Sequence, residues 1–302
     1  MSKTVLILGA SGRFGRHAGE AFESQGWEVR KFDRASGNLR DAATGVDVIV
    51  NAWNPAYPDW AAQVPKLTAQ VIDAAKISGA TVIIPGSVYN YGVDAPAIYG
   101  VDTPHRAENP LGRVRIDLET AYRASNVPTI IIRAGDFIDT QASGNWFDMM
   151  MIPKLGKGRF VYPGNPDIPH AWAWLPDLTK ATVELAKMRA DLPVFAEFPF
   201  PGYTMTGNEL CAAIGRCLGR PITLKKMNWL PLQIARPFWP LARHLLEMRY
   251  LWNKPHQIDG KKFTTFLPDF KITPLAEILP LALGDHINPD KVVTRGKGAA
   301  HA

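Results

Sequence analysis

The stretch Gly9-Ala10-Ser11-Gly12-Arg13-Phe14-Gly15 decides how the first half of this chain is expected to fold. It directly follows the apolar run Val5–Leu8 and opens a segment with helical spacing, so it joins a strand to a helix. In such a loop, backbone N–H groups and the positive end of the helix converge where a pyrophosphate can lie. Gly9 is expected to permit the tight turn, Gly12 to admit the phosphates, and Gly15 to let helix and strand pack closely. The loop therefore predicts a dinucleotide site at Gly9, Ser11, Gly12, Arg13, Phe14 and Gly15.

Short apolar runs alternate with longer segments of helical spacing through the first half of the chain. The runs are Val5–Leu8, Val46–Val50, Thr81–Ile84 and Thr129–Ile132. This alternation predicts βαβ units with parallel strands. Because the runs are apolar at nearly every position, we expect helices on both faces of the sheet. The sequence therefore predicts an α/β fold with a Rossmann-type doubly wound parallel sheet.

The composition changes from about residue 140, where Trp, Pro, Phe and Met become frequent and the regular strand–helix alternation stops. We therefore expect an NAD(P)-binding Rossmann domain over residues 1–140, with sheet-completing segments up to about residue 200. A smaller C-terminal substrate lobe, interleaved with the Rossmann core, is expected over residues 141–287. The small, basic and aperiodic residues 288–302 predict a flexible tail.

Three helix starts carry capping signals. Asn109-Pro110 predicts the start of a helix that ends at Ser125, and Asp177 is expected to cap a helix over Leu178–Met188. Thr206-Gly207-Asn208-Glu209 is a capping box, and it predicts a helix that closes at Gly219.

The bulk composition is that of a globular protein, with 302 residues of which 46% are hydrophobic and 21% charged. Lys and Arg number 34 against 28 Asp and Glu, and their scattered positions predict no nucleic-acid partner. No apolar span is long enough for a bilayer, so no membrane partner is expected. Cys211 and Cys217 fall on one expected helix roughly 9 Å apart, too far to pair, which favours a reducing cytoplasmic location. No cluster of His, Cys and Asp has the spacing of metal ligands, so no metal is expected.

The end of the second expected strand carries signals for both forms of the cofactor. Val29–Phe32 is followed by Asp33-Arg34, which offers a carboxylate for a ribose diol and a guanidinium for a 2′-phosphate. Arg13 in the glycine loop adds a second positive charge within reach of the same phosphate. The sequence therefore predicts NAD(P), with a preference for NADP(H).

Several motifs resemble the short-chain dehydrogenase/reductase superfamily, in particular its extended and atypical branches, which include nucleotide-sugar epimerases and NmrA-like proteins. The glycine spacing G-x-x-G-x-x-G is typical of that superfamily. Gly37-Asn38-Leu39-Arg40-Asp41 is similar to its adenine-contacting Gly-Asp-Leu segment, with Asn38 in place of the acid. Val48-Ile49-Val50-Asn51-Ala52 resembles a strand with an Asn/His-Ala end. The resemblance, which spans about residues 3–280, implies cofactor contacts at Asn38, Leu39, Asn51 and Ala52.

The same resemblance implies an altered catalytic set. Ile83–Gly92 is similar to the family's Ser-Ser-Ser-x-x-Val-Tyr-Gly stretch and places Ser87 at the serine that hydrogen-bonds the substrate's reacting oxygen. The family's Tyr-x-x-x-Lys pair falls on Leu111 and Arg115. Arg115 can donate to a nicotinamide ribose, but it is a fixed cation and a poor proton relay. The proton is therefore expected from a substituted donor, such as Tyr89 or His105, or from water; the other tyrosines nearby in the sequence are Tyr91 and Tyr99.

Bulky side chains are frequent in the linking segments and the second lobe, and if some of them line the cleft the substrate is apolar or aromatic. They include Trp53, Tyr57, Trp60, Trp146, Phe147, Trp172, Trp229 and Trp239. The sequence predicts an NAD(P)-dependent oxidoreductase that acts on a carbonyl, enone or hydroxyl of such a small molecule. Two alternatives stay open: a nucleotide-sugar epimerase or dehydratase with tightly bound NAD, and a non-catalytic NAD(P) sensor of the NmrA type. The resemblance also allows for a homodimer that pairs through two long helices flanking the sheet.

Overall fold

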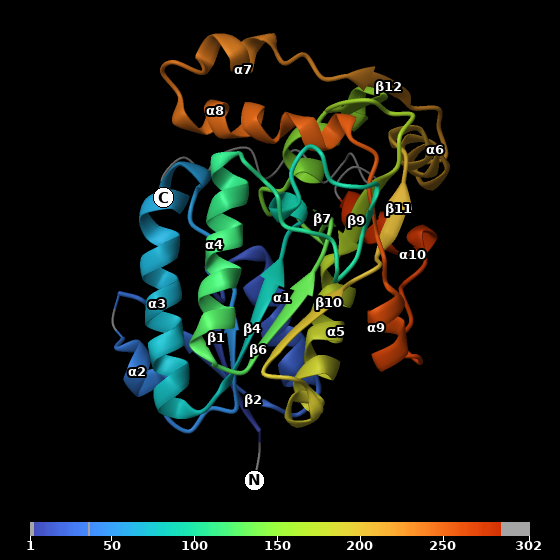
Figure 1. The fold of residues 1–302 in the computed structure, drawn as a ribbon. Helices are drawn as coiled ribbons and strands as arrows, with labels where there is room; N and C mark the ends of the chain where they lie inside the picture. The colour runs from blue at the N-terminus through green and yellow to red at the C-terminus, as the bar shows by residue number, and fades with distance from the viewer. Residues whose placement is uncertain (1–2, 36, 285–302) are drawn as a thin grey trace.

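The computed structural model describes residues 3–35 and 37–284, and it is built around a six-stranded parallel sheet (Figure 1). The strands lie in the order β10-β6-β4-β3-β1-β2. Their bounds are β1 Thr4–Leu8, β2 Glu28–Phe32, β3 Val48–Asn51, β4 Thr81–Gly86, β6 Thr129–Arg133 and β10 Phe195–Pro199. The chain places β2 on one side of β1 and β3 on the other, so the strand order reverses between β1 and β3. In open α/β sheets, ligands bind at the carboxyl ends of the strands at such a reversal.

Helices cover both faces of this sheet, which confirms the predicted α/β class (Figure 1). On one face α3 (Trp60–Ser78) packs beside α4 (Pro110–Ser125), and on the other α1 (Arg13–Ser24) packs beside α5 (Leu175–Lys187). Alternate residues of β1 face opposite sides, with Leu6 and Leu8 in one buried cluster and Val5 and Ile7 in the other. The continuous apolar runs are therefore explained by burial on both faces of the sheet.

The remaining elements form small sheets and short helices beyond the carboxyl edge and along one side of the main sheet (Figure 1). The further strands are β5 Ile98–Tyr99, β7 Asp136–Ile138, β8 Arg159–Tyr162, β9 His170–Trp174, β11 Tyr203–Met205, β12 Thr223–Lys226 and β13 Gln257–Ile258. The further helices are α2 Leu39–Ala42, α6 Gly207–Cys217, α7 Leu230–Ala235, α8 Pro240–Glu247, α9 Lys261–Phe266 and α10 Leu275–Leu283. Short helical turns span Tyr57–Asp59, Val88–Asn90, Phe147–Met151, Leu155–Lys157, Arg189–Asp191 and Met248–Asn253. A third buried cluster, rich in Trp, lies among these elements and includes Trp146, Trp172 and Trp252.

Two of the three predicted helix starts are confirmed. Asn109 is the N-cap residue of α4, with Pro110 as its first residue. The capping box of α6 is complete: Glu209 N donates to Thr206 Oγ1 over 3.1 Å, and Thr206 N donates to Glu209 Oε2 over 2.8 Å. Gly219, with a φ of +62°, lies just past the end of this helix.

The predicted role of Asp177 as a helix cap is wrong. Helix α5 begins at Leu175, directly after β9, because Pro176 fits the first turn of a helix and Trp174 supplies the extended N-cap residue. The buried Asp177 carboxylate instead accepts hydrogen bonds from Thr273 N and Oγ1, over 2.7 and 2.8 Å. It therefore attaches the segment after α9 to this helix.

Cys211 and Cys217 both lie on α6 as free thiols, as predicted. Within the described residues, none of the helices has the length and apolar character needed to cross a membrane. The predicted tail, residues 288–302, lies outside the described residues. The division into residues 1–140 and 141–287 stays a prediction.

Candidate functional site

The three glycines of the loop lie at the reversal of strand order, and each answers a different steric demand. Gly9 has a φ of +75°, and a Cβ there would lie 3.0 Å from the carbonyl oxygen of Ala52 at the end of β3. A Cβ on Gly15 would overlap the carbonyl oxygen of Gly9, so α1 packs against the loop only without a side chain there. Gly12 is exposed, and its Cβ would meet a single neighbour, Gly9 O at 3.2 Å. The space in front of Gly12 is therefore open.

The first turn of α1 faces this open space. Gly12 is its N-cap residue, and no side chain of the described residues caps the turn or places an acid in it. The N–H groups of this turn and the positive end of the helix can therefore receive an anion. Ser11 is exposed beside them, whereas the Phe14 side chain is buried in the core and can offer only its backbone. These residues fit the pyrophosphate of a dinucleotide.

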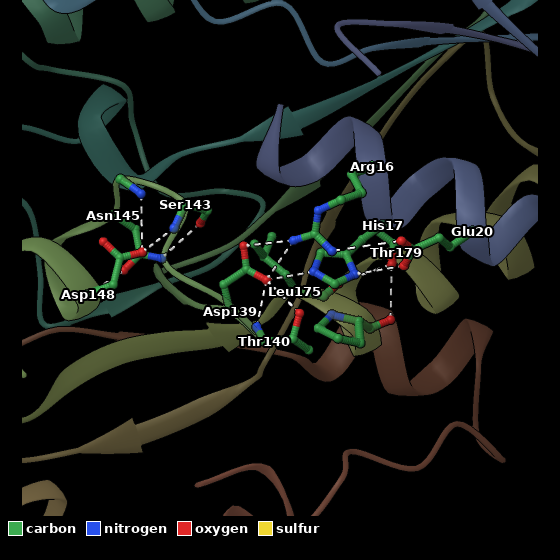
Figure 2. Close-up of polar contacts among 12 residues, drawn as sticks. Arg16, His17, Glu20, Asp139, Thr140, Ser143, Asn145, Asp148, Leu175 and Thr179 are labelled. Carbon is green, nitrogen blue, oxygen red and sulfur yellow. Dashed lines mark hydrogen bonds and ion pairs between the residues drawn. The ribbon is translucent and has the colours of Figure 1, made fainter. Parts of the chain in front are cut away.

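A buried carboxylate ties the loop that follows β7 to α1 (Figure 2). Asp139 accepts hydrogen bonds from Arg16 Nη2 over 3.1 Å and shares one of 2.6 Å with His17 Nε2. Burial on its own raises the pKa of Asp139, but hydrogen bonds from His17 and Ser143 outweigh it, and the pKa falls to about 2. The carboxylate is therefore charged at neutral pH and holds the loop against the helix.

The same loop also holds Arg13. Arg13 Nη2 donates to the carbonyl oxygen of Gly144 over 2.9 Å. The turn is closed by Asp148, which accepts from Ser143 N and Gly144 N over 2.6 and 3.1 Å (Figure 2). The guanidinium that was expected to reach the cofactor's phosphate thus bonds, in this structure, to the backbone of the loop after β7.

The end of β2 offers a second cation. Arg34 is exposed, and its guanidinium lies 5.5 Å from the centre of the Trp53 ring, which follows β3. Asp33 is also exposed and accepts a hydrogen bond of 2.9 Å from Ala35 N. Asn38 accepts from Arg40 N over 3.0 Å and so caps the short helix α2, which begins at Leu39. The end of β2 thus presents an exposed cation, Arg34, beside the aromatic ring of Trp53.

Asn51 holds the end of β3 in place. Its Nδ2 donates to Tyr122 Oη on α4 over 3.1 Å, and its Oδ1 accepts from Trp53 N over 3.3 Å. The Asn51 side chain is buried, so it orders the wall that Ala52 and Trp53 present to the glycine loop.

Ser87 and Tyr89 follow β4 at the carboxyl edge of the sheet. Ser87 is half-buried, and its Oγ accepts from Tyr89 N over 3.4 Å. The hydroxyl groups of Tyr89 and Tyr57 share a hydrogen bond of 2.7 Å. Burial raises the pKa of both phenols, that of Tyr89 well above its usual value. Both phenols therefore keep their protons at neutral pH.

Arg115 points from α4 toward the end of β4. Its Nη2 donates to the carbonyl oxygen of Pro85 over 2.7 Å, and its guanidinium lies 5.9 Å from the centre of the Trp60 ring. Burial lowers the pKa of Arg115, and this effect is opposed in part by Glu119 and Tyr89, which raise it. Arg115 Nε has no partner among the described residues. Leu111, one turn earlier, is 1% exposed and fills its position with an apolar side chain.

A buried ion network contacts the backbone of Ser87. Arg133 is fully buried; it pairs with both oxygens of Glu119 over 3.1 and 2.7 Å and with Glu197 over 2.6 Å. Its Nη1 also donates to the carbonyl oxygen of Ser87 over 2.6 Å. His105, Glu119 and Glu197 are the one group in the described chain that has the spacing of metal ligands. Because the Arg133 guanidinium already pairs with both carboxylates, we interpret this group as structural.

A polar pair that the sequence analysis missed lies near the two phenols. His170 Nε2 and Asp136 Oδ2 are 2.7 Å apart, and the His170 ring stacks on Trp252 with centroids 4.2 Å apart. Burial is the main cause of the raised pKa values of Tyr57 and Tyr89, and the charge of Asp136 adds to it. A histidine in the otherwise apolar strand β9 was the signal available in the sequence.

Several buried polar atoms around this pair have no hydrogen-bond partner among the described residues. They are Tyr99 Oη, Tyr162 Oη, Trp172 Nε1, Tyr250 Oη and His256 Nε2. The His256 ring lies 4.3 Å from that of His170 and 5.5 Å from that of Tyr99. Burial lowers the pKa of His256 to about 3, so it is neutral. Buried polar atoms are normally paired, so this group is suited to a polar ligand or to ordered water.

Comparison with solved structures finds many chains of the same architecture. MoeE5 in complex with UDP-glucose and NAD is 16% identical with a TM-score of 0.72, over 93% of this chain and 97% of that one. UDP-glucose 4-epimerase from Brucella ovis in complex with NAD is 17% identical with a TM-score of 0.71, over 93% and 97%. UDP-glucose 4-epimerase from Bifidobacterium longum in complex with NAD+ and UDP is 15% identical with a TM-score of 0.68, over 95% and 99%.

Comparison of the sequence with protein-family models finds no match, and comparison with curated proteins finds none either. The likeness is therefore one of architecture, and it extends along nearly the whole chain. The chain therefore shares the fold of solved nucleotide-sugar epimerases, in agreement with the Rossmann-type fold that its motifs predict.

Proposed function

We propose that this protein is an NAD(P)-dependent oxidoreductase in which the phenol pair Tyr57–Tyr89 replaces the missing tyrosine at position 111. The observation that carries the proposal is the 2.7 Å contact between the two hydroxyl groups, on the same carboxyl edge of the sheet as Ser87 and Arg115. A bound nicotinamide would supply or accept the hydride. The chain itself must hold the substrate oxygen and deliver a proton.

Ser87 and Tyr89 divide this work. Ser87 Oγ accepts from Tyr89 N, so its own hydrogen stays available for the substrate oxygen. Tyr89 donates its proton to that oxygen, and the phenolate that remains accepts a hydrogen bond from Tyr57. The fixed charge of Arg115 stabilises this phenolate, and water restores the proton. Arg115 Nε, which lacks a partner among the described residues, is the group assigned to the nicotinamide ribose.

The surroundings of the phenol pair favour an apolar or aromatic substrate with one reacting oxygen. The Tyr57 ring packs edge-on against Trp60 at 5.1 Å, and Trp60 lies 6.2 Å from Tyr89. Trp60 itself is buried, whereas Tyr57 and Tyr89 are half-buried, and aromatic side chains of this kind bind apolar surface while a few polar groups fix orientation. We therefore propose a carbonyl, enone or hydroxyl compound of this class as substrate.

A second candidate is a nucleotide-sugar epimerase, which the fold likeness to two UDP-glucose 4-epimerases favours. In that case substrate is converted while the amount of cofactor stays constant. A third is a sensor that binds NAD(P) without turnover. Incubation of the protein with NADPH or NADH and a panel of carbonyl and enone compounds separates the oxidoreductase from the other two. Steady cofactor oxidation supports the oxidoreductase, and its absence across the panel overturns it.

The cofactor preference and the assembly are also proposals. We propose that Arg34 gives NADP(H) its advantage, because it is exposed at the end of β2 where a 2′-phosphate would lie. We further propose a homodimer through α3 and α4, whose outer faces form a shallow groove lined mainly by small and apolar residues. A cytoplasmic location fits the two free thiols on α6. Light scattering in solution tests the homodimer, and a monomeric mass contradicts it.

A further inference from the structure

Four large apolar side chains are exposed close together on the α7–α8 hairpin, residues 229–247. The hairpin lies across the top of the molecule, beyond the carboxyl edge of the sheet (Figure 1). Phe238 is 89% exposed, Ile234 67%, Leu230 55% and Trp239 46%. Scattered apolar residues are normal on protein surfaces, but a group that includes two aromatic rings marks an interaction site.

The hairpin is firmly attached to the body of the protein on its other side. Trp229 is buried and donates from Nε1 to the carbonyl oxygen of Pro163 over 2.7 Å. Leu232 and Ala242 are buried in the Trp-rich cluster, and Glu247 accepts from Leu111 N over 2.7 Å. The outward apolar face is therefore presented by an anchored, amphipathic element.

This part of the chain is also strongly basic. Residues 216–254 contain eight Lys and Arg and a single acid, Glu247, which bonds inward to the start of α4. The basic residues are Arg216, Arg220, Lys225, Lys226, Arg236, Arg243, Arg249 and Lys254. Five of them that border or lie within the hairpin are exposed: Lys225, Lys226, Arg236, Arg243 and Arg249. An anionic partner therefore complements this surface.

We propose that the α7–α8 hairpin docks onto the surface of an anionic lipid membrane. Phe238 and Trp239 enter the interface between headgroups and acyl chains, and the surrounding Lys and Arg side chains contact lipid phosphates. The absence of a membrane-spanning helix in the described residues does not bear on such surface binding. The proposal replaces the sequence-based expectation of no membrane partner.

The charges of the hairpin favour a membrane over the other possible binding partners of the same face. A second copy of the hairpin would bring two basic surfaces together and would be repelled. The C-terminal segment, residues 285–302, carries Lys291, Arg295 and Lys297 against Asp285 and Asp290, so its net charge is not negative. Only an anionic membrane offers both an apolar interior for the exposed aromatic rings and negative charge for the Lys and Arg side chains.

Docking would also place the candidate site close to the membrane. Glu247 of α8 bonds to Asn109 Nδ2 and Leu111 N, at the start of the helix that carries Arg115. An apolar substrate dissolved in the membrane would then reach the site over a short distance. This link rests on the proposed function, whereas the docking itself does not.

The test is co-sedimentation of the full chain with two kinds of vesicle, phosphatidylcholine alone and an equal mixture of phosphatidylcholine and phosphatidylglycerol. We expect the wild type to pellet with the anionic vesicles, weakly with the neutral ones, and less as salt increases. Phe238→Glu and the pair Lys225→Glu/Lys226→Glu should each lower the bound fraction on anionic vesicles about tenfold. All these side chains are exposed, so the fold should be unchanged by circular dichroism.

Two matched variants act as controls away from the hairpin. Val194→Glu changes a 53% exposed apolar residue just before β10, and Lys180→Glu reverses an exposed charge on α5. Both should bind anionic vesicles like the wild type. The proposal is overturned if the wild type pellets with neither vesicle, or if Phe238→Glu binds as the wild type does. It is equally overturned if light scattering shows a dimer that only the hairpin variants dissociate, because the face would then bind a second copy.

Discussion

The hydroxyl oxygens of Tyr57 and Tyr89 lie 2.7 Å apart where β3 and β4 end, although 32 residues separate them in the chain. Tyr89 lies in the short helical turn after β4, and Tyr57 opens the short turn that leads into α3. Neither residue is at position 111, where the resemblance to the short-chain dehydrogenase/reductases would place a catalytic tyrosine and this chain has Leu. In the proposed function, this pair of phenols takes the role of the proton donor that position 111 lacks.

Removal of the Tyr89 hydroxyl should therefore abolish most of the turnover. We expect Tyr89→Phe to lower kcat by about 10²–10⁴-fold, because a positioned acid contributes that much, and to leave cofactor affinity unchanged. Tyr57→Phe should lower kcat less than Tyr89→Phe does. The double variant should lower kcat no more than Tyr89→Phe alone, because both hydroxyl groups act on the same proton. Steady-state kinetics on an identified substrate provide the measurement.

The matched control for Tyr89→Phe is Tyr91→Phe. The Tyr91 hydroxyl is buried without a partner among the described residues, and its ring stacks on Tyr99 at 4.3 Å. This variant should keep near-normal turnover. If Tyr89→Phe and Tyr91→Phe lose the same amount, the effect is structural and the assignment of Tyr89 is wrong.

Ser87 should affect chemistry and not cofactor binding. Ser87→Ala removes the hydroxyl assigned to the substrate oxygen while the backbone contact from Arg133 to the Ser87 carbonyl stays. We expect kcat to fall about 10²-fold or more and the Kd for NADPH to change little. Full turnover in Ser87→Ala would show that the substrate oxygen lies elsewhere.

Arg34 should determine the choice between the two cofactors. A charge-assisted pair with a phosphate contributes about 1.5–3 kcal/mol, so Arg34→Ala should weaken NADPH binding by about 10- to 100-fold. NADH binding should change little. Arg30→Ala is the control, because Arg30 lies on β2, which leads to Arg34, but is paired with Glu28 over 2.8 Å. Tighter binding of NADH than of NADPH by the wild type would assign the site to Asp33 and NAD.

Asp139 should make the fold sensitive to acid. Its pKa of about 2 lies below the ordinary value of about 3.9, so its charge stabilises the folded state above about pH 4, and this contribution is lost as the pH falls toward 2. We expect Asp139→Asn to lower the free energy of unfolding by about 2 kcal/mol at pH 7. Near pH 2 the free energies of unfolding of the variant and the wild type should differ less.

Urea unfolding at both pH values provides this measurement, with Asp117→Asn on the exposed side of α4 as control. An equal loss of stability for Asp139→Asn at both pH values would mean that the carboxylate charge is not what holds the loop after β7 to α1.

The sheet and the glycine loop could be predicted because their signals are local. A continuous apolar run indicates that a strand is buried on both faces. The glycine spacing indicates where backbone segments lie in close contact, as Gly9 does with Ala52 and Gly15 with Gly9. The capping box at Thr206 and Glu209 is local in the same sense, since both partners lie within one turn. These features follow from neighbours in the sequence.

The polar partnerships could not be predicted, because they join residues that are far apart in the chain. Asp136 and His170 are 34 residues apart and meet because β7 pairs with β9. Asp177 reads as a helix cap in the sequence, and only the position of Thr273, 96 residues later, shows what its carboxylate bonds. The periodicity of a sequence indicates whether a side chain is buried, but it does not indicate which distant residue that side chain contacts.

The most direct test of the central claim is calorimetric titration of NADPH and NADH into the wild type, Gly12→Val and Gly19→Ala. A Cβ at Gly12 meets only one backbone atom at 3.2 Å, so Gly12→Val should fold, but its side chain fills the space assigned to the pyrophosphate. Gly19 lies further along α1, where a Cβ makes ordinary contacts near 3.9 Å, and Gly19→Ala is the control. We predict that the wild type and Gly19→Ala bind a nicotinamide dinucleotide and that Gly12→Val binds it about 100-fold more weakly or not at all. Absence of binding of either cofactor, oxidised or reduced, by the wild type would contradict the account.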